Sequence, residues 1–126
     1  MKVLQIVESA YRATSEEQDD TVLWLTHAMK GAGGDFTVLL CGAAVNYAVP
    51  GQDASGLTFG AWKQTEPPRL AESIAGLIAK SVDVYAVKED MEERGLADTT
   101  LVPGIRRINR SRIAGLMDAH QQVWHW

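Results

Sequence analysis

The stretch that decides the fold is SVDVYAVKEDMEERGL, residues 81–96. Apolar residues alternate from Val82 onward, and charged residues then follow at helical spacing until Gly95. This pattern predicts a buried strand that leads directly into a short helix. In a layered α/β protein, the carboxyl end of such a strand faces the crevice where ligands bind. The residue at that end is Val87, and its side chain has no reactive group.

Two other stretches, 3–7 and 36–41, have the apolar character of strands buried on both faces of a parallel sheet. The pair Thr14 and Glu17, or Ser15 and Gln18, has capping-box spacing ahead of a first helix. Further elements are predicted from apolar spacing, turn residues and helix caps. They are helices near 22–31, 43–49, 68–78, 88–94 and 113–117, a weak extended piece at 99–102, and a closing strand at 122–126.

Strands that alternate with helices predict an α/β fold. We expect a three-layer domain with a mostly parallel sheet of four or five strands and helices on both faces, because parallel neighbours need crossover connections. The chain of 126 residues has the length of one domain, so residues 1–126 are expected to form a single one. Its composition, 46% apolar and 22% charged, is typical of a globular protein.

Charge and motifs exclude several classes of function. The net charge of −4 disfavours nucleic-acid binding, and no apolar run has the length of a membrane span. The only cysteine, Cys41, cannot form an internal disulfide, which fits a reducing, cytoplasmic setting. No cofactor is expected, since the glycines of 31–34 follow a helix rather than a strand, and no metal is expected from the spacing of the histidines.

The segment 84–96 also resembles a known family. Val84-Tyr85-Ala86, one variable position and a short helix that closes on Arg94-Gly95-Leu96 are similar to the core segment of the DsrE/DsrF-like family, which includes the sulfur-relay proteins TusD and TusC. The order of strands, helices and long loop in the rest of the chain matches as well.

The resemblance implies a flavodoxin-related α/β fold, homo-oligomers such as trimers or hexamers or assemblies with related subunits, and sulfur-relay proteins as partners. In the members that carry sulfur, the variable position is a cysteine that bears a persulfide. This chain has Val87 there, so the family's activity does not transfer to that residue.

Polar residues that follow the strands are the candidates for a ligand site, because the carboxyl ends of parallel strands share one edge of the sheet. These candidates are Glu8, Ser9, Tyr11 and Arg12 after the first strand, Cys41, Gly42 and Asn46 after the second, and Lys88 and Glu89 after the third. Polar residues after strands are also what an ordinary loop supplies. Lys88 and Glu89 in particular have the charge spacing of a solvated helical face.

Cys41 is the candidate nucleophile, and two interpretations of it stay open. It lies at a strand end ahead of a predicted helix, and a helix N-terminus lowers the pKa of a thiol. It also ends the apolar run 39–41, and free cysteine is among the most buried residue types. It replaces the family's cysteine only if the ends of the second and third strands adjoin in space.

Four arginines lie within seven residues of an acidic chain: Arg106, Arg107, Arg110 and Arg112. They are candidates for binding a partner, because several are expected at or before a helix start, where the helix dipole disfavours cations. An anionic partner and a solvated turn both explain the cluster.

The leading functional hypothesis is an oligomeric accessory subunit of intracellular sulfur trafficking, with Cys41 as a possible substitute carrier of a persulfide. The alternative is a non-catalytic module that uses the crevice and the loop 50–66 to bind a small ligand or a partner. A purely structural subunit is the third class.

Overall fold

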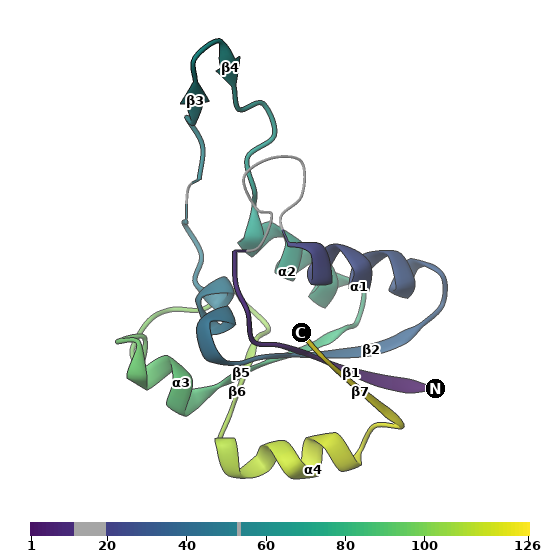
Figure 1. Ribbon diagram of the computed structural model, residues 1–126. Helices are drawn as coiled ribbons and strands as arrows, with labels where there is room; N and C mark the ends of the chain where they lie inside the picture. Colours follow the sequence, from purple (N-terminus) through teal and green to yellow (C-terminus); the bar gives the residue numbers. More distant parts are fainter. Residues whose placement is uncertain (12–19, 53) are drawn as a thin grey trace.

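The computed structural model describes residues 1–11, 20–52 and 54–126. A five-stranded sheet forms the middle layer, and helices cover both of its faces (Figure 1). The strands of this sheet are β1 (Lys2–Val7), β2 (Asp35–Leu40), β5 (Asp83–Val87), β6 (Arg106–Ile108) and β7 (Gln122–His125). The helices are α1 (Thr21–Gly31), α2 (Leu70–Ala79), α3 (Lys88–Glu93) and α4 (Ile113–Asp118), with 3-10 turns η1 (Gly42–Ala48) and η2 (Arg110–Arg112). The three-layer α/β fold expected from the sequence is confirmed.

The strand order is β6-β5-β2-β1-β7, and every pairing in this sheet is parallel. The chain moves outward from β1 through β2 and β5 to β6, and then crosses back to place β7 on the other side of β1. Ile6 of β1 therefore lies opposite Leu39 on one side and His125 on the other. The order of the strands reverses beside β1, and open α/β sheets bind ligands at such a point.

The reversal also decides which face each helix covers. Right-handed crossovers that advance in one direction place their helices on one face of a sheet, and the return connection places its helix on the opposite face. Figure 1 shows α1 and α2 together on one face and α4 alone on the other. Alternate residues of the central strands enter the two cores: Val7 and Leu40 pack towards α1 and α2, and Ile6 and Leu39 pack towards α4.

Three expectations from the sequence need correction. The stretch 99–102 forms no strand: Val102 is buried, and its N–H donates to the carbonyl of Ala48 at 2.8 Å. The strand lies instead at β6, and its arginines are tolerated because they stay exposed to solvent at the edge of the sheet. Within the expected long loop, β3 (Thr58–Phe59) and β4 (Trp62–Lys63) form an antiparallel hairpin that projects from the sheet (Figure 1).

Helix α1 begins at Thr21, and Asp20 is its N-cap. The residues with capping-box spacing, 14–18, lie outside the described residues. The buried carboxylate of Asp20 accepts hydrogen bonds from the N–H groups of Val22 and Leu23, at 2.8 and 3.2 Å. It also accepts one from the hydroxyl of Tyr47 at 2.5 Å. One side chain thus satisfies the helix end and a buried phenol, and so connects α1 to η1.

We predict that Asp20→Ala lowers the free energy of unfolding by about 2 to 4 kcal/mol, because the helix loses its cap and the Tyr47 hydroxyl loses its acceptor. Asp20→Asn keeps an oxygen at the cap and should cost less than half as much. Chemical denaturation of both variants checks this. Equal losses for the two substitutions would contradict the assigned role.

Candidate functional site

A cavity of about 390 Å³ opens at the carboxyl edge of the sheet, where the strand order reverses. Its apolar wall comes from the ends of β1 and β2 and from α4, and consists of Ile6, Leu39, Ile113 and Met117. Its polar rim consists of Glu8, Asp90, Glu93, Arg94, Arg110 and His125. Cys41 and Gly42 complete the lining. The cavity therefore combines one thiol, an apolar wall and a charged rim.

The structure brings Cys41 next to the position that Val87 occupies. Strands β2 and β5 are neighbours, and Leu40 lies opposite Ala86, so Cys41 and Val87 are the next residues on adjoining strands. Val87 is fully buried in the apolar cluster below α4, and Cys41 packs against the same cluster. The condition that the two strand ends adjoin is met. The thiol lies one strand away from position 87 and lines the cavity.

The surroundings of Cys41 suppress its ionisation. Partial burial removes water from the thiol, and the carboxylates of Glu8 and Asp90 add negative charge nearby. These causes together raise the pKa of Cys41 from 9.0 to about 11. Although Cys41 precedes the seven-residue 3-10 helix η1, its pKa is raised, which contradicts the interpretation that a helix N-terminus lowers it. At neutral pH the side chain is a thiol, which is a far weaker nucleophile than a thiolate.

Asp90 holds three segments of the site together. Its carboxylate accepts hydrogen bonds from the N–H of Gly42 at 2.8 Å and from the guanidinium of Arg110 at 2.5 Å. Partial burial acts to raise the pKa of Asp90, but the bonds from Gly42 and Arg110 and the nearby charge of Arg94 outweigh it and lower the pKa below 3.8. The carboxylate thus links the end of β2, helix α3 and turn η2.

A second pair closes the rim on the side of β7. The Nε2 atom of His125 lies 2.6 Å from Oε2 of Glu8. Both side chains are more than half exposed, so the pair is screened by water. Because the charged groups of the rim are largely paired with one another, the rim presents no concentration of unpaired positive charge for an anion.

The other predicted ligand residues do not line this cavity. Tyr11 donates its N–H to Tyr47 and its hydroxyl to Gln52, and burial raises the pKa of its phenol. The side-chain amide of Asn46 donates a hydrogen bond to the carbonyl of Ala43 at 2.9 Å, within its own 3-10 helix. The backbone N–H of Ser9 donates to the carbonyl of Trp126. Arg12 lies outside the described residues.

Lys88 and Glu89 have structural partners. Lys88 is exposed and lies 3.8 Å from Glu92, the ion pair of an ordinary solvated helical face. Both carboxylate oxygens of Glu89 accept from the N–H of Arg110, at 2.9 and 3.0 Å. Of the residues expected after the strands, the structure brings Glu8, Cys41 and Gly42 together at the cavity.

The four arginines divide between two surfaces. Arg110 reaches the Cys41 cavity, where it contacts Asp90 and Glu93. Arg106, Arg107 and Arg112 lie on the other side of α4 and line a different pocket. Arg106 and Arg107 belong to β6, and the two arginines of η2, Arg110 and Arg112, line different spaces.

Sequence reasoning missed Asp90, Glu93, Arg94 and His125. Asp90 and Glu93 of α3 and its C-cap Arg94 belong to the stretch that the sequence pattern singled out. Asp90 follows Val87 by three residues, a spacing that places it over the strand end. No local sequence pattern indicated that His125 would belong to the site. Only the pairing of β7 with β1 brings it to the rim.

No group of three or more metal-ligating side chains occurs within residues 1–11, 20–52 and 54–126. None of the helices in that part of the chain combines the length and the apolar character needed to cross a membrane.

The comparisons with known proteins support the architecture. The crystal structure of the ychN protein from E. coli is similar to this one, with a TM-score of 0.75 over the whole length of both chains and 20% sequence identity. At this identity the likeness establishes a shared fold. No protein-family model and no curated protein sequence matches the chain.

From the raised pKa, we predict that Cys41 reacts with a neutral alkylating reagent about a hundred times more slowly at pH 7 than an unperturbed cysteine. The rate should keep rising up to about pH 11. Glu8→Gln should accelerate the reaction, because one of the two nearby negative charges is lost, whereas Glu72→Gln on α2 should not. Mass spectrometry of timed samples measures the rate. A rate that is already constant above pH 8 would exclude this environment.

We predict that Asp90→Asn lowers the free energy of unfolding at neutral pH by about 1 to 3 kcal/mol, because the charged acceptor is lost. The pKa of Asp90 is lower in the folded state than in the unfolded state, so its contribution is complete above the unfolded value of 3.8 and disappears as the pH falls through the folded value. Denaturation between pH 7 and pH 2 should therefore show the two proteins converging. The exposed Asp98→Asn serves as the control, and a difference independent of pH would argue against the charged hydrogen bonds.

Proposed function

We propose that this protein is a DsrE/DsrF-like accessory subunit that works in or beside intracellular sulfur trafficking. The observation that carries the proposal is the cavity at the strand ends, beside the position where the family's sulfur carriers have their cysteine. The resemblance of the segment 84–96 and the fold shared with the ychN protein support it.

In this role the cavity binds a small sulfur-bearing group of a donor or partner without a covalent bond. Its volume of about 390 Å³ lies in the usual range of ligand pockets, and its apolar wall suits the weakly polar sulfur chain of a persulfide. Because residue 87 is valine, the chain lacks the cysteine that accepts sulfur in the family's carriers. Cys41 is protonated and does not take up the sulfur in its place.

We further propose that the subunit works as an oligomer, a trimer or a hexamer. Large apolar side chains that stay exposed support this, because such surfaces commonly mark contacts between proteins. The hairpin carries Phe59 and Trp62, which are 68% and 42% exposed, and α1 carries Trp24, which is 54% exposed.

A second candidate is a persulfide carrier that uses Cys41 itself. The observation in its favour is that the thiol lines the cavity one strand away from position 87. The reaction requires Cys41 to lose its proton and attack the terminal sulfur of a donor persulfide, which leaves the donor as a thiol. The pKa of about 11 opposes the first step, which makes this the second choice.

Incubation of the full chain with glutathione persulfide separates the two candidates. For the accessory role, we expect the persulfide to raise the melting temperature of the wild type and of Cys41→Ala equally, and intact-mass measurement to find no added sulfur. Ile113→Trp, which fills the cavity, should abolish the shift, and Val123→Trp on exposed β7 should keep it.

The gain of one sulfur atom in the wild type, lost in Cys41→Ala, would establish the carrier instead. The absence of a shift and of added sulfur in both proteins would refute both candidates.

A further inference from the structure

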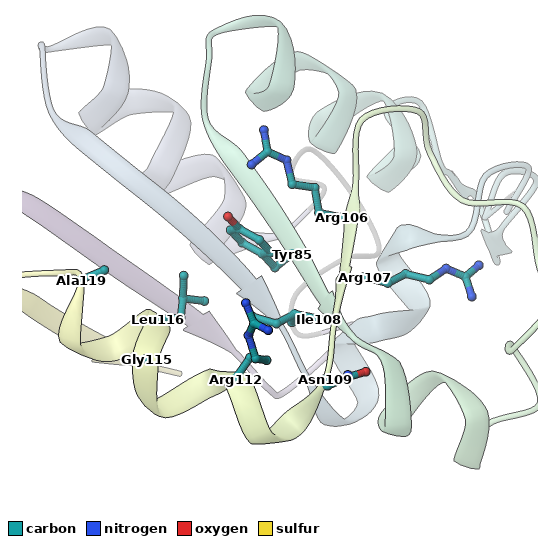
Figure 2. A pocket seen from close by; sticks show the side chains of 9 residues that line it. All are labelled: Tyr85, Arg106, Arg107, Ile108, Asn109, Arg112, Gly115, Leu116 and Ala119. Carbon is teal, nitrogen blue, oxygen red and sulfur yellow. The ribbon is translucent and has the colours of Figure 1, made fainter.

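A second pocket, of about 700 Å³, opens on the face of the sheet that α4 covers. Helix α4 has six residues, and the pocket lies beside it, over Tyr85 of β5 and residues 106–108 of β6. Figure 2 shows the side chains of Tyr85, Ile108 and Leu116 in the space between these strands and the helix. The pocket's volume lies in the range of sites for small organic ligands.

Helix α4 separates this pocket from the Cys41 cavity. Ile113 and Met117, one helical turn apart, line the cavity, whereas Gly115, Leu116 and Ala119 line the pocket. No residue lines both spaces. The pocket is therefore a separate site, with side chains of a different chemical kind.

The charge of the pocket is opposite to the charge of the protein. Its lining contains Arg106, Arg107 and Arg112 and no aspartate or glutamate, although the chain as a whole has a net charge of −4. Positive charges that line one pocket repel one another, and an anionic ligand reduces this repulsion. Arginine is also the side chain best suited to bind phosphate or carboxylate through two parallel hydrogen bonds.

Two of the three arginines are available to a ligand. Arg107 donates to the carbonyls of Ala97 and Thr99, at 2.6 and 2.7 Å, and Figure 2 shows its side chain pointing away from the pocket. Arg112 is exposed and has no ion-pair or hydrogen-bond partner for its guanidinium in the part of the chain that the structure describes, and its side chain points towards Ile108 and Tyr85 (Figure 2).

Arg106 is held only weakly. It lies 3.6 Å from Asp83, and both side chains are more than half exposed, so the pair contributes little and a stronger anion can replace it. Its guanidinium carbon also lies 5.9 Å from the centre of the Tyr85 ring. This contact holds the positive charge over the apolar floor of the pocket.

The floor itself is apolar and partly flat. The Tyr85 ring is half-buried, and Tyr85, Ile108 and Leu116 all line the pocket and pack against the apolar cluster below α4. An inorganic anion leaves this surface in water, whereas a ligand with a flat ring covers it. The side-chain amide of Asn109 adds a hydrogen-bonding group at the rim.

We propose that this pocket binds an organic anion of mononucleotide size, of the class of nucleoside phosphates. The phosphate groups contact Arg106 and Arg112, and the ring lies on the floor of Tyr85, Ile108 and Leu116. This site is independent of the proposed role in sulfur trafficking, because it uses neither the cavity nor Cys41.

Titration calorimetry of the full chain with ADP tests the proposal. We expect saturable binding that weakens as the salt concentration rises, because the contacts are ionic. Adenosine, which lacks the charge, and inorganic pyrophosphate, which lacks the ring, should each bind at least about ten times more weakly. The double variant Arg106→Gln, Arg112→Gln should raise Kd for ADP by about tenfold or more.

The matched control is Arg69→Gln, which removes the same charge from an exposed arginine at the start of α2, on the other face of the sheet. It should leave the affinity for ADP unchanged. The proposal is overturned if ADP shows no saturable binding, if adenosine or pyrophosphate binds as tightly as ADP, or if the double variant binds ADP as the wild type does. Amide NMR spectra of the variants verify that they are folded.

Discussion

The parallel pairing of β1 with β2 on one side and β7 on the other is the constraint on which the rest of the structure depends. The ladder continues past the end of β1, where Trp126 donates to the carbonyl of Ile6 at 2.9 Å and Glu8 donates to that of Trp126 at 3.0 Å. The central strand β1 is also covered on both faces, by α1 and α2 on one side and by α4 on the other, which explains its nearly continuous apolar sequence. The pairing of β1 with β7 also forces the final crossover to the opposite face, where α4 completes the Cys41 cavity.

The chemistry of the Cys41 cavity follows from how charge is balanced at the sheet edge. Asp90 is needed to hold β2, α3 and η2 together, and its charge is compensated by Arg110. Yet Asp90 and Glu8 also lie near the thiol, and together with burial they keep Cys41 protonated. The interactions that stabilise the site thus make Cys41 a poor nucleophile.

Helix α4 divides the second face of the sheet into two separate hollows. Because residues one turn apart share a side of a helix, Ile113 and Met117 face the thiol while Leu116 faces the arginines. One hollow is the Cys41 cavity, whose rim charges are largely paired with one another. The other is an open pocket in which Arg106 and Arg112 are available to a ligand.

The sequence by itself determined the α/β class, the first three buried strands and the helix that follows Val87, because burial on both faces and helical spacing are local patterns. It also located Cys41 and Glu8 at strand ends that meet. Tertiary structure alone decided that 106–108 rather than 99–102 forms the fourth strand, since Val102 is buried by packing and β6 is defined by its pairing with β5. It likewise decided that His125 reaches Glu8 and that burial raises the pKa of Cys41, because strand order and the distances between side chains remote in sequence have no local signal.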